Sequence, residues 1–115
     1  IDKKGSFLKS VGLNKQLPIS KSTFETIKEG MRESAKINGL DKYLVYSKTG
    51  TAEIGDGISP HTWLIGYYES EKLGKISFVV FIENGGTTKL NIAFLNSLFN
   101  RLENSELKEY AAIKQ

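Results

Sequence analysis

Three strand-prone runs joined by short connections are the feature that most limits what this chain can fold into. The runs lie at residues 43–51, 61–68 and 75–82, and each is rich in β-branched and aromatic residues. Consecutive strands with short links normally pair antiparallel. The third run is almost continuously apolar, which predicts a strand that is covered on both faces. We therefore expect a three-stranded antiparallel sheet.

An amphipathic helix is predicted before these strands. It begins at a capping box from Ser22 to Glu25, with Ser20 as a competing N-cap. It ends at Asn38-Gly39, two residues that tolerate left-handed backbone geometry. The apolar stripe of this helix, at spacings of three and four, consists of Phe24, Ile27, Met31 and Ala35. The stripe is interpreted as core rather than as a ligand site.

A second helix is predicted after the last strand, capped by Thr87 or Thr88. Its expected apolar stripe consists of Leu90, Ala93, Phe94, Leu98 and Leu102. The expected fold class is α+β: a three-stranded antiparallel sheet with both helices packed on one face. Residues 1–115 are expected to form one unit, with an irregular lead-in at 1–19, a core at 20–104 and a frayed tail at 105–115.

Composition excludes several classes of function. The net charge of +3 is small, and the lysines are scattered rather than interleaved with aromatic residues, so no nucleic-acid partner is expected. The chain has no cysteine and a single histidine, His61, so neither a metal site nor a cofactor is expected. His61 is interpreted as a structural residue at the end of a strand. No apolar run reaches the length of a membrane span, and no signal-peptide pattern opens the chain.

The quartet Lys48-Thr49-Gly50-Thr51 carries the chemistry that the sequence suggests. It continues a strand-prone run, so alternation places Lys48 and Gly50 on one side and Thr49 and Thr51 on the other. Lysine supplies a positive charge, threonine supplies hydroxyls, and glycine permits close approach of another molecule to the backbone. This set suits a carboxylate lying along a strand edge. A nucleotide-binding P-loop is excluded, since Ser47 and Lys42 occupy the positions of its two glycines.

Wider context links this quartet to a known family. Lys48 to Glu53 is followed by a His-x-Trp-x-x-Gly-Tyr strand from His61 to Tyr67, and then by Ile76 to Ile82 ending in Glu-Asn-Gly-Gly. Together these motifs resemble the C-terminal part of the penicillin-binding transpeptidases, and most closely the high-molecular-mass class B enzymes. The resemblance runs from about Ser20 to about Leu102. Ser47 departs from it, because the family often has glycine before the lysine.

The resemblance implies roles for four residues. Lys48 would provide positive potential for the terminal carboxylate of a D-Ala-D-Ala peptide, and Thr49 and Thr51 would offer it hydroxyls. The backbone N–H of Thr51 would be an oxyanion-hole donor, and Gly50 would let the substrate lie against the strand. The implied reaction is serine acyl transfer in peptidoglycan cross-linking, which β-lactams inhibit by forming a stable acyl-enzyme.

The serine nucleophile is not evident in this chain. Ser6 and Ser105 each open a Ser-x-x-Lys pattern, but neither is followed by the apolar helix that the family places there. The nucleophile is therefore expected on an upstream part of a longer protein, one anchored at the extracytoplasmic face of the bacterial membrane. Two alternatives stay open: a serine β-lactamase or β-lactam sensor, and a non-catalytic domain with a chance Lys-Thr-Gly. The expected partners are stem peptides, β-lactams and the upstream part of the domain.

Self-association is a further expectation. In the family the sheet has five strands, and the two from the start of the chain lie beside the last strand. Residues 76–82 then offer unpaired backbone groups to a second copy or to the upstream part, unless residues 1–19 occupy that position.

Overall fold

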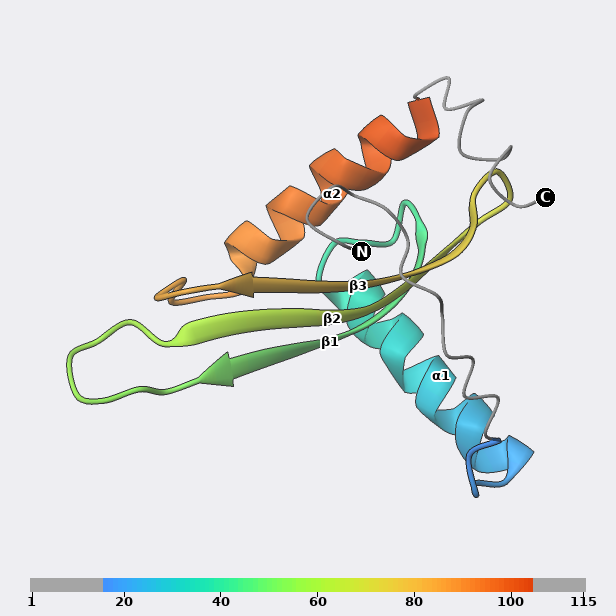
Figure 1. Cartoon of the computed structure of the whole chain (residues 1–115), viewed down its shortest axis with the longest axis horizontal. Coiled ribbons are helices and arrows are strands. Elements are labelled where there is room, and N and C mark those ends of the chain that lie inside the picture. The colour runs from blue at the N-terminus through green and yellow to red at the C-terminus, as the bar shows by residue number, and fades with distance from the viewer. Residues whose placement is uncertain (1–15, 105–115) are drawn as a thin grey trace, which may run out of the picture.

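A computed structural model describes residues 16–104 of the chain. The elements follow the order α1 (Lys21–Ile37), β1 (Leu44–Ala52), β2 (His61–Ser70), β3 (Gly74–Ile82) and α2 (Lys89–Asn104), as Figure 1 shows. The three strands form one antiparallel sheet in the order β1-β2-β3. The predicted α+β fold class is confirmed, in an arrangement consistent with the C-terminal half of the transpeptidase fold.

The register of the sheet fixes which residues share a face. Val45 of β1 lies opposite Tyr68 of β2, and Tyr68 lies opposite Ile76 of β3. These residues and their alternate neighbours form the face that packs against α2, called here the inner face. The outer face carries exposed large apolar side chains, among them Trp63, Ile65, Val79 and Phe81. The expectation that both faces of the third strand are covered is therefore met on the inner face only, within the described residues.

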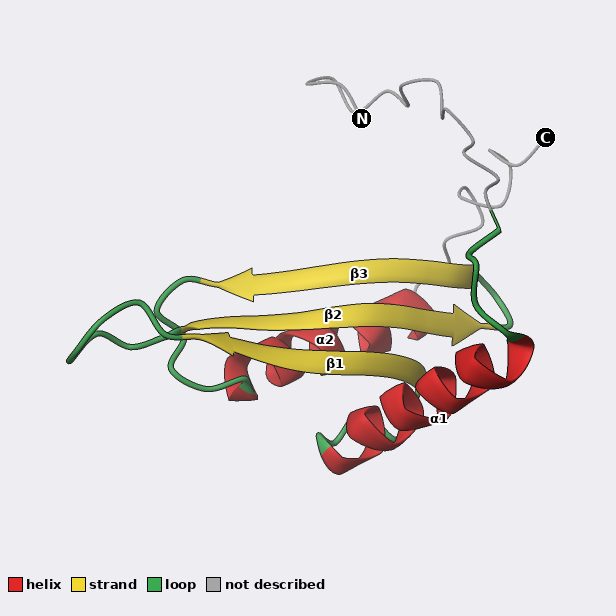
Figure 2. Cartoon of the chain, turned by 90° about the horizontal axis from the view of Figure 1, so that it is seen from below, coloured by secondary structure: helices red, strands yellow, loops and turns green. Residues whose placement is uncertain are grey.

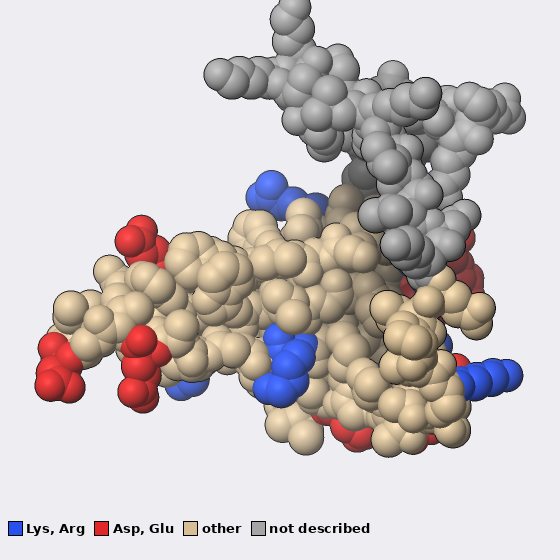
Figure 3. Space-filling model, turned by 60° about the horizontal axis from the view of Figure 1, so that its bottom comes forward, with Lys and Arg blue, Asp and Glu red and all other residues tan. Residues whose placement is uncertain are grey.

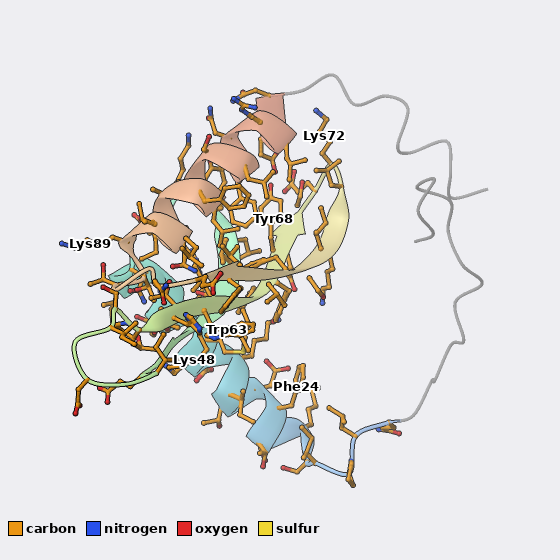
Figure 4. The ribbon with its side chains drawn as sticks, turned by 60° about the vertical axis from the view of Figure 1, so that its left-hand side comes forward. Phe24, Lys48, Trp63, Tyr68, Lys72 and Lys89 are labelled. Atoms are coloured by element: carbon orange, nitrogen blue, oxygen red, sulfur yellow. The ribbon has the colours of Figure 1, made fainter. Side chains whose placement is uncertain are left out.

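The core lies between the inner face and α2. Tyr68 stacks on Phe99 of α2 with ring centroids 4.5 Å apart, and Leu64 and Leu95 are fully buried beside them. Figure 4 shows Tyr68 between the sheet and this helix. The expected stripe of α2 is partly wrong, because Leu90, Ala93 and Phe94 are exposed and only Leu98 and Leu102 are partly buried. Since apolar residues occur on more than one side of α2, helical periodicity alone does not decide which side faces the sheet.

The first helix differs from expectation in its cap and its position. Its N-cap is Ser20 rather than Ser22, because the Ser20 hydroxyl accepts a hydrogen bond from the backbone N–H of Thr23 at 3.1 Å. The C-terminal half of α1 reaches the core through Ala35, whereas Lys28 lies over the ring of Tyr46 on the outer face. The helix thus crosses the edge of β1, and the expectation that both helices cover one face is wrong for α1 (Figures 1 and 2).

Residues 1–15 and 105–115 lie outside the described part of the chain. The predictions made for the Ser6 and Ser105 motifs, for most of the lead-in and for the tail therefore fall outside it. Residues 16–19 form no strand. Within residues 16–104, no helix combines the length and apolar character needed to cross a membrane.

Candidate functional site

The candidate site is the open edge of β1. Near the start of this strand, the guanidinium of Arg32 donates hydrogen bonds to the carbonyls of Tyr43 at 2.9 Å and Val45 at 3.2 Å. These carbonyls therefore point away from β2. Because the direction of backbone groups alternates along a strand, the N–H and C=O groups of Thr49 and Thr51 point to the same edge. Among residues 16–104, Arg32 covers only the first part of this edge, and the part formed by the Lys-Thr-Gly-Thr quartet stays open.

Lys48 brings a positive charge to this edge. Its side chain is exposed, and its Nζ donates a hydrogen bond to the carbonyl of Thr49 at 2.9 Å. Since that carbonyl faces the open edge, the ammonium group lies beside the edge rather than far out over the sheet. An anion placed along β1 would meet the ammonium group and the N–H groups of Thr49 and Thr51 together.

The side chains of the quartet leave β1 on both faces, as the sequence predicted. Lys48 and Gly50 share the outer face with their cross-strand neighbours Ile65 and Trp63, whereas Thr49 and Thr51 lie on the inner face. The structure therefore brings the four predicted site residues together only along the strand edge. Thr51 is exposed near the end of the strand, so its hydroxyl is accessible.

Gly50 is a glycine that the packing of this chain does not require. A Cβ at position 50 would touch only the Cβ of Trp63, at 3.5 Å, which is an ordinary contact. Gly66 shows the contrast, because a Cβ there would lie 2.0 Å from the carbonyl oxygen of Tyr46. The absence of a side chain at Gly50 thus creates space beside β1, next to the Lys48 ammonium group, without serving an internal contact.

An apolar wall adjoins this space. Trp63 lies next to Gly50 on β2, and its ring contacts that of Phe81 at a centroid distance of 4.4 Å. Figure 4 shows Lys48 and Trp63 at the same part of the sheet. Acidic side chains gather instead at the end of the molecule where the β1–β2 loop lies, as Figure 3 shows, and Glu53 and Asp56 of that loop are exposed. These charges would attract a carboxylate toward Lys48 and repel it from the loop.

His61 has a structural role at the end of β2, as the sequence predicted. Its Nδ1 accepts a hydrogen bond from the backbone N–H of Asn84 at 3.0 Å, and its ring packs edge-on against Phe81. The imidazole thereby ties the end of β3 to the start of β2. Among residues 16–104, no cluster of three or more His, Cys, Asp or Glu side chains could hold a metal ion.

A buried polar link behind the site was missed by sequence reasoning. Asn91 of α2 is fully buried; its Oδ1 accepts a hydrogen bond from the Thr62 hydroxyl at 2.8 Å, and its Nδ2 donates to the Val80 carbonyl at 3.1 Å. Thr62 lies opposite Thr51 in the sheet. The link therefore fixes α2 to the end of the sheet that carries the site. The available signal in the sequence was a polar residue, Asn91, next to the apolar stripe of α2.

Two stacked tyrosines on the outer face mark where α1 approaches the sheet. The rings of Tyr46 and Tyr67 lie 4.6 Å apart, and the Lys28 ammonium group lies 5.0 Å from the Tyr46 ring centroid. Burial, followed by the neighbouring Tyr46, Glu69 and Glu25, raises the pKa of Tyr67 above its ordinary value. The Tyr67 phenol therefore releases its proton at a higher pH than an ordinary tyrosine.

Two hollows in the surface of the described part of the chain lie away from the quartet. One, of about 320 Å³, is lined by Lys42, Tyr43 and Tyr68 among others, between the start of β1 and the end of α2. Another, of about 400 Å³, lies along α1 beside Tyr46. Neither includes Lys48 or Thr51, so the candidate site is a strand edge rather than a closed pocket.

Comparison with known proteins identifies the family of this chain. The comparisons with curated proteins and with solved structures gave no match. Residues 6–102 match the family model described as the penicillin binding protein transpeptidase domain. The matched range spans α1, β1, β2 and β3 and all but the last two residues of α2, and residues 48–51 lie within it. It counts against an unrelated domain in which Lys-Thr-Gly occurs by chance. The chain belongs to the family of penicillin-binding protein transpeptidase domains.

Proposed function

We propose that this chain supplies the substrate-binding strand of a serine D,D-transpeptidase that cross-links peptidoglycan and is inhibited by β-lactams. The observation that carries the proposal is the open edge of β1, where the Lys48 ammonium group, the Thr51 N–H and the space beside Gly50 adjoin one another. The family match supports a transpeptidase of this class. The peptide substrate and the roles of single residues go beyond the family match and are part of the proposal.

In the proposed complex, the D-Ala-D-Ala end of a stem peptide lies antiparallel to β1. Its terminal carboxylate is held by the Lys48 ammonium group and by the hydroxyls of Thr49 and Thr51. The carbonyl that is attacked accepts a hydrogen bond from the Thr51 N–H, which stabilises the negative charge that develops on its oxygen. The side-chain-free position at Gly50 allows the peptide backbone to approach the strand.

The nucleophile of the proposed reaction is a serine outside residues 16–104, because the described residues contain no Ser-x-x-Lys pattern. It attacks the carbonyl carbon and D-alanine leaves. An amine of a neighbouring stem peptide then takes the acyl group, which restores the serine. The partners proposed are therefore stem peptides, β-lactams and the part of the transpeptidase domain that carries the serine, at the extracytoplasmic face of the membrane.

Thr51 offers a test that separates its backbone from its side chain. The variant Thr51→Pro removes the N–H, and because this N–H points away from β2, no hydrogen bond of the sheet is lost. Thr51→Ala keeps the N–H and removes only the hydroxyl. In the protein that carries the complete transpeptidase domain, we expect Thr51→Pro to slow acylation by a fluorescent penicillin about 10²–10³-fold, as for other oxyanion donors. Thr51→Ala should slow it much less.

Lys48→Ala should slow the same acylation roughly tenfold to a hundredfold, the equivalent of losing one charge-assisted hydrogen bond. The thermal midpoint should change little, because Lys48 is exposed and bonds to the carbonyl of its own neighbour. Lys89→Ala, at an exposed lysine on α2, is the matched control. Acylation at the unmodified rate in both Lys48→Ala and Thr51→Pro would refute the proposed site.

A further inference from the structure

We propose that Asn91 of α2 is a positioning residue for the substrate-binding end of β1 and acts through Thr62 of β2. The proposal rests on the function proposed above, in which the Thr51 N–H stabilises the charge that develops on the attacked carbonyl. The side chain of Asn91 bonds to β2 and β3 rather than to β1. Any effect of Asn91 on the site must therefore pass through the sheet.

Asn91 is the polar one of the three residues of α2 that are buried against the sheet. These residues are Asn91, Leu95 and Phe99, at intervals of four. Phe99 stacks on Tyr68 toward the end of β2, whereas Asn91 bonds to Thr62 at its start. Apolar contacts tolerate small shifts, but a satisfied network of buried hydrogen bonds specifies one arrangement. The helix is therefore held by directional contacts at the end of the sheet that carries the site.

The network uses both ends of the Asn91 amide. Its Oδ1 accepts a hydrogen bond from the Thr62 hydroxyl at 2.8 Å, and its Nδ2 donates to the carbonyls of Val80 at 3.1 Å and Thr62 at 3.4 Å. Asn91 and Thr62 are both fully buried, so a bond lost here leaves a buried polar group without a partner. The position of Thr62 is thus tied to that of α2.

The start of β2 is held at two further points by the segment between β3 and α2. The Pro60 carbonyl accepts a hydrogen bond from the Gly86 N–H at 3.1 Å. The Nδ1 of His61 accepts one from the Asn84 N–H at 3.0 Å. Three consecutive residues, 60–62, are therefore anchored by groups that follow β3 in the chain, in addition to the pairing of the strands.

Gly85 leaves room for the Thr62 hydroxyl within this anchor. A Cβ at position 85 would lie 2.5 Å from the hydroxyl oxygen, although the backbone of Gly85 does not adopt a positive φ. The space that the hydroxyl occupies, rather than the backbone conformation, therefore requires glycine here. The turn and Asn91 together confine this hydroxyl to one place.

The start of β2 in turn places the end of β1. Thr51 lies opposite Thr62. Because the N–H and C=O groups of Thr51 point to the open edge, the two threonines form a non-hydrogen-bonded pair, in which the side chains lie close together. The ladder hydrogen bonds on either side of Thr51 are made by Gly50 and Ala52, to the residues next to Thr62. A shift of Thr62 consequently moves the Thr51 N–H.

The accuracy of this placement matters for the acylation step. An oxyanion donor acts when it lies about 2.7–3.1 Å from the oxygen that gains charge. A misplacement of about 1 Å can slow a reaction about 10²-fold. The Lys48 ammonium group, in contrast, bonds to the carbonyl of its own neighbour and does not depend on Thr62. Loss of the bond between Asn91 and Thr62 should therefore slow acylation more than it weakens binding.

The test measures acylation by a penicillin in the protein that carries the complete transpeptidase domain. Rapid kinetics separate the dissociation constant of the first, non-covalent complex from the rate constant of acylation. Thr62→Val keeps the shape and removes the hydroxyl; it should lower the rate constant about tenfold to a hundredfold and change the dissociation constant less than about threefold. Thr62→Ser keeps the hydroxyl and should lower the rate constant much less. An unchanged rate constant in Thr62→Val would overturn the proposal.

A double variant separates positioning from stability. Asn91→Leu combined with Thr62→Val fills the same space with apolar groups and leaves neither partner unpaired. We expect its acylation rate constant to fall about tenfold to a hundredfold although the protein stays folded. Asn96→Ala is the control on the same helix, because it removes a hydrogen bond to the Gly39 carbonyl and should leave both constants unchanged. A stable double variant with unmodified acylation would show that Asn91 is only structural.

The infrared band of the acyl-enzyme ester carbonyl distinguishes failure of this proposal from failure of the proposed function. A weaker hydrogen bond to this carbonyl moves its band to higher wavenumber, and we expect such a shift in both Thr51→Pro and Thr62→Val. A shift in Thr51→Pro without one in Thr62→Val would overturn the positioning role alone. A band that stays in place in Thr51→Pro would refute the proposed donor, and the positioning role with it.

Discussion

Replacement of Asn91 by alanine should destabilise the chain more than its single amide suggests. The residue is fully buried, and it binds the Thr62 hydroxyl at 2.8 Å and the Val80 carbonyl at 3.1 Å. Two hydrogen bonds contribute about 1 kcal/mol each, and a buried hydroxyl left without a partner costs a further 1–3 kcal/mol. We therefore expect a total loss of about 3–5 kcal/mol.

Urea unfolding followed by tryptophan fluorescence measures this loss, since Trp63 is the single tryptophan and is on β2, one residue from Thr62. Asn96→Ala is the matched control; it removes one hydrogen bond, to the Gly39 carbonyl, from a less buried amide. Its expected cost is about 1 kcal/mol. If Asn91→Ala cost no more than Asn96→Ala, the buried link would not hold α2 to the sheet.

A second variant keeps the reasoning testable if Asn91→Ala fails to fold. Asn91→Leu combined with Thr62→Val replaces both partners by apolar groups of similar shape, which can be nearly neutral. The double variant should therefore be more stable than Asn91→Leu alone by about 1–3 kcal/mol, because no buried hydroxyl stays unpaired. Equal stabilities of the single and double variants would contradict the proposed pairing of Thr62 with Asn91.

Three further predictions follow from local geometry. Gly66→Ala should lower the free energy of unfolding in urea by more than about 3 kcal/mol, because the added Cβ would overlap the Tyr46 carbonyl. Gly50→Ala should change it by less than about 1 kcal/mol, and similar costs for the two variants would contradict the assigned difference. Ser47→Ala should stabilise the chain by about 1 kcal/mol, because the fully buried Ser47 hydroxyl has no hydrogen-bond partner among residues 16–104, and a loss of stability would reveal one. The pKa of Tyr67 is raised in the folded chain, so the unfolded chain releases this proton at a lower pH than the folded chain does. The contribution of the Tyr67 phenol to stability is therefore present below pH 10.0, the ordinary pKa value, and is lost as the pH rises through the pKa of the folded state. In an absorbance titration of tyrosinate, Tyr67→Phe should remove a group that titrates above pH 10.0, and loss of a group that titrates at or below that pH would contradict the shift.

The sequence alone determined the order of elements and the geometry of the quartet. Strand-prone runs with short links leave antiparallel pairing as the normal outcome, and the period of two in a strand places Lys48 and Thr49 on opposite faces whatever surrounds them. The roles of Gly39 at the end of α1 and of His61 at the end of β2 were also predictable. Gly39 has φ +78°, a conformation that glycine adopts without strain. These properties depend on residues that are close in the chain, so they can be predicted from the local sequence.

Only the tertiary structure decided how the helices meet the sheet. The apolar residues of α2 cover more than one side, and the choice between Leu95 and Phe94 as the buried residue depends on hydrogen bonds from Asn91 to strands earlier in the chain. In the same way, α1 crosses the edge of β1, where Arg32 donates hydrogen bonds to backbone carbonyls of that strand. The apolar stripe of α1 does not by itself predict this position. Contacts between distant elements also left the outer face of β3 exposed within the described residues. Periodicity reports which side of an element is apolar, but which element covers that side is settled by the packing of all of them together.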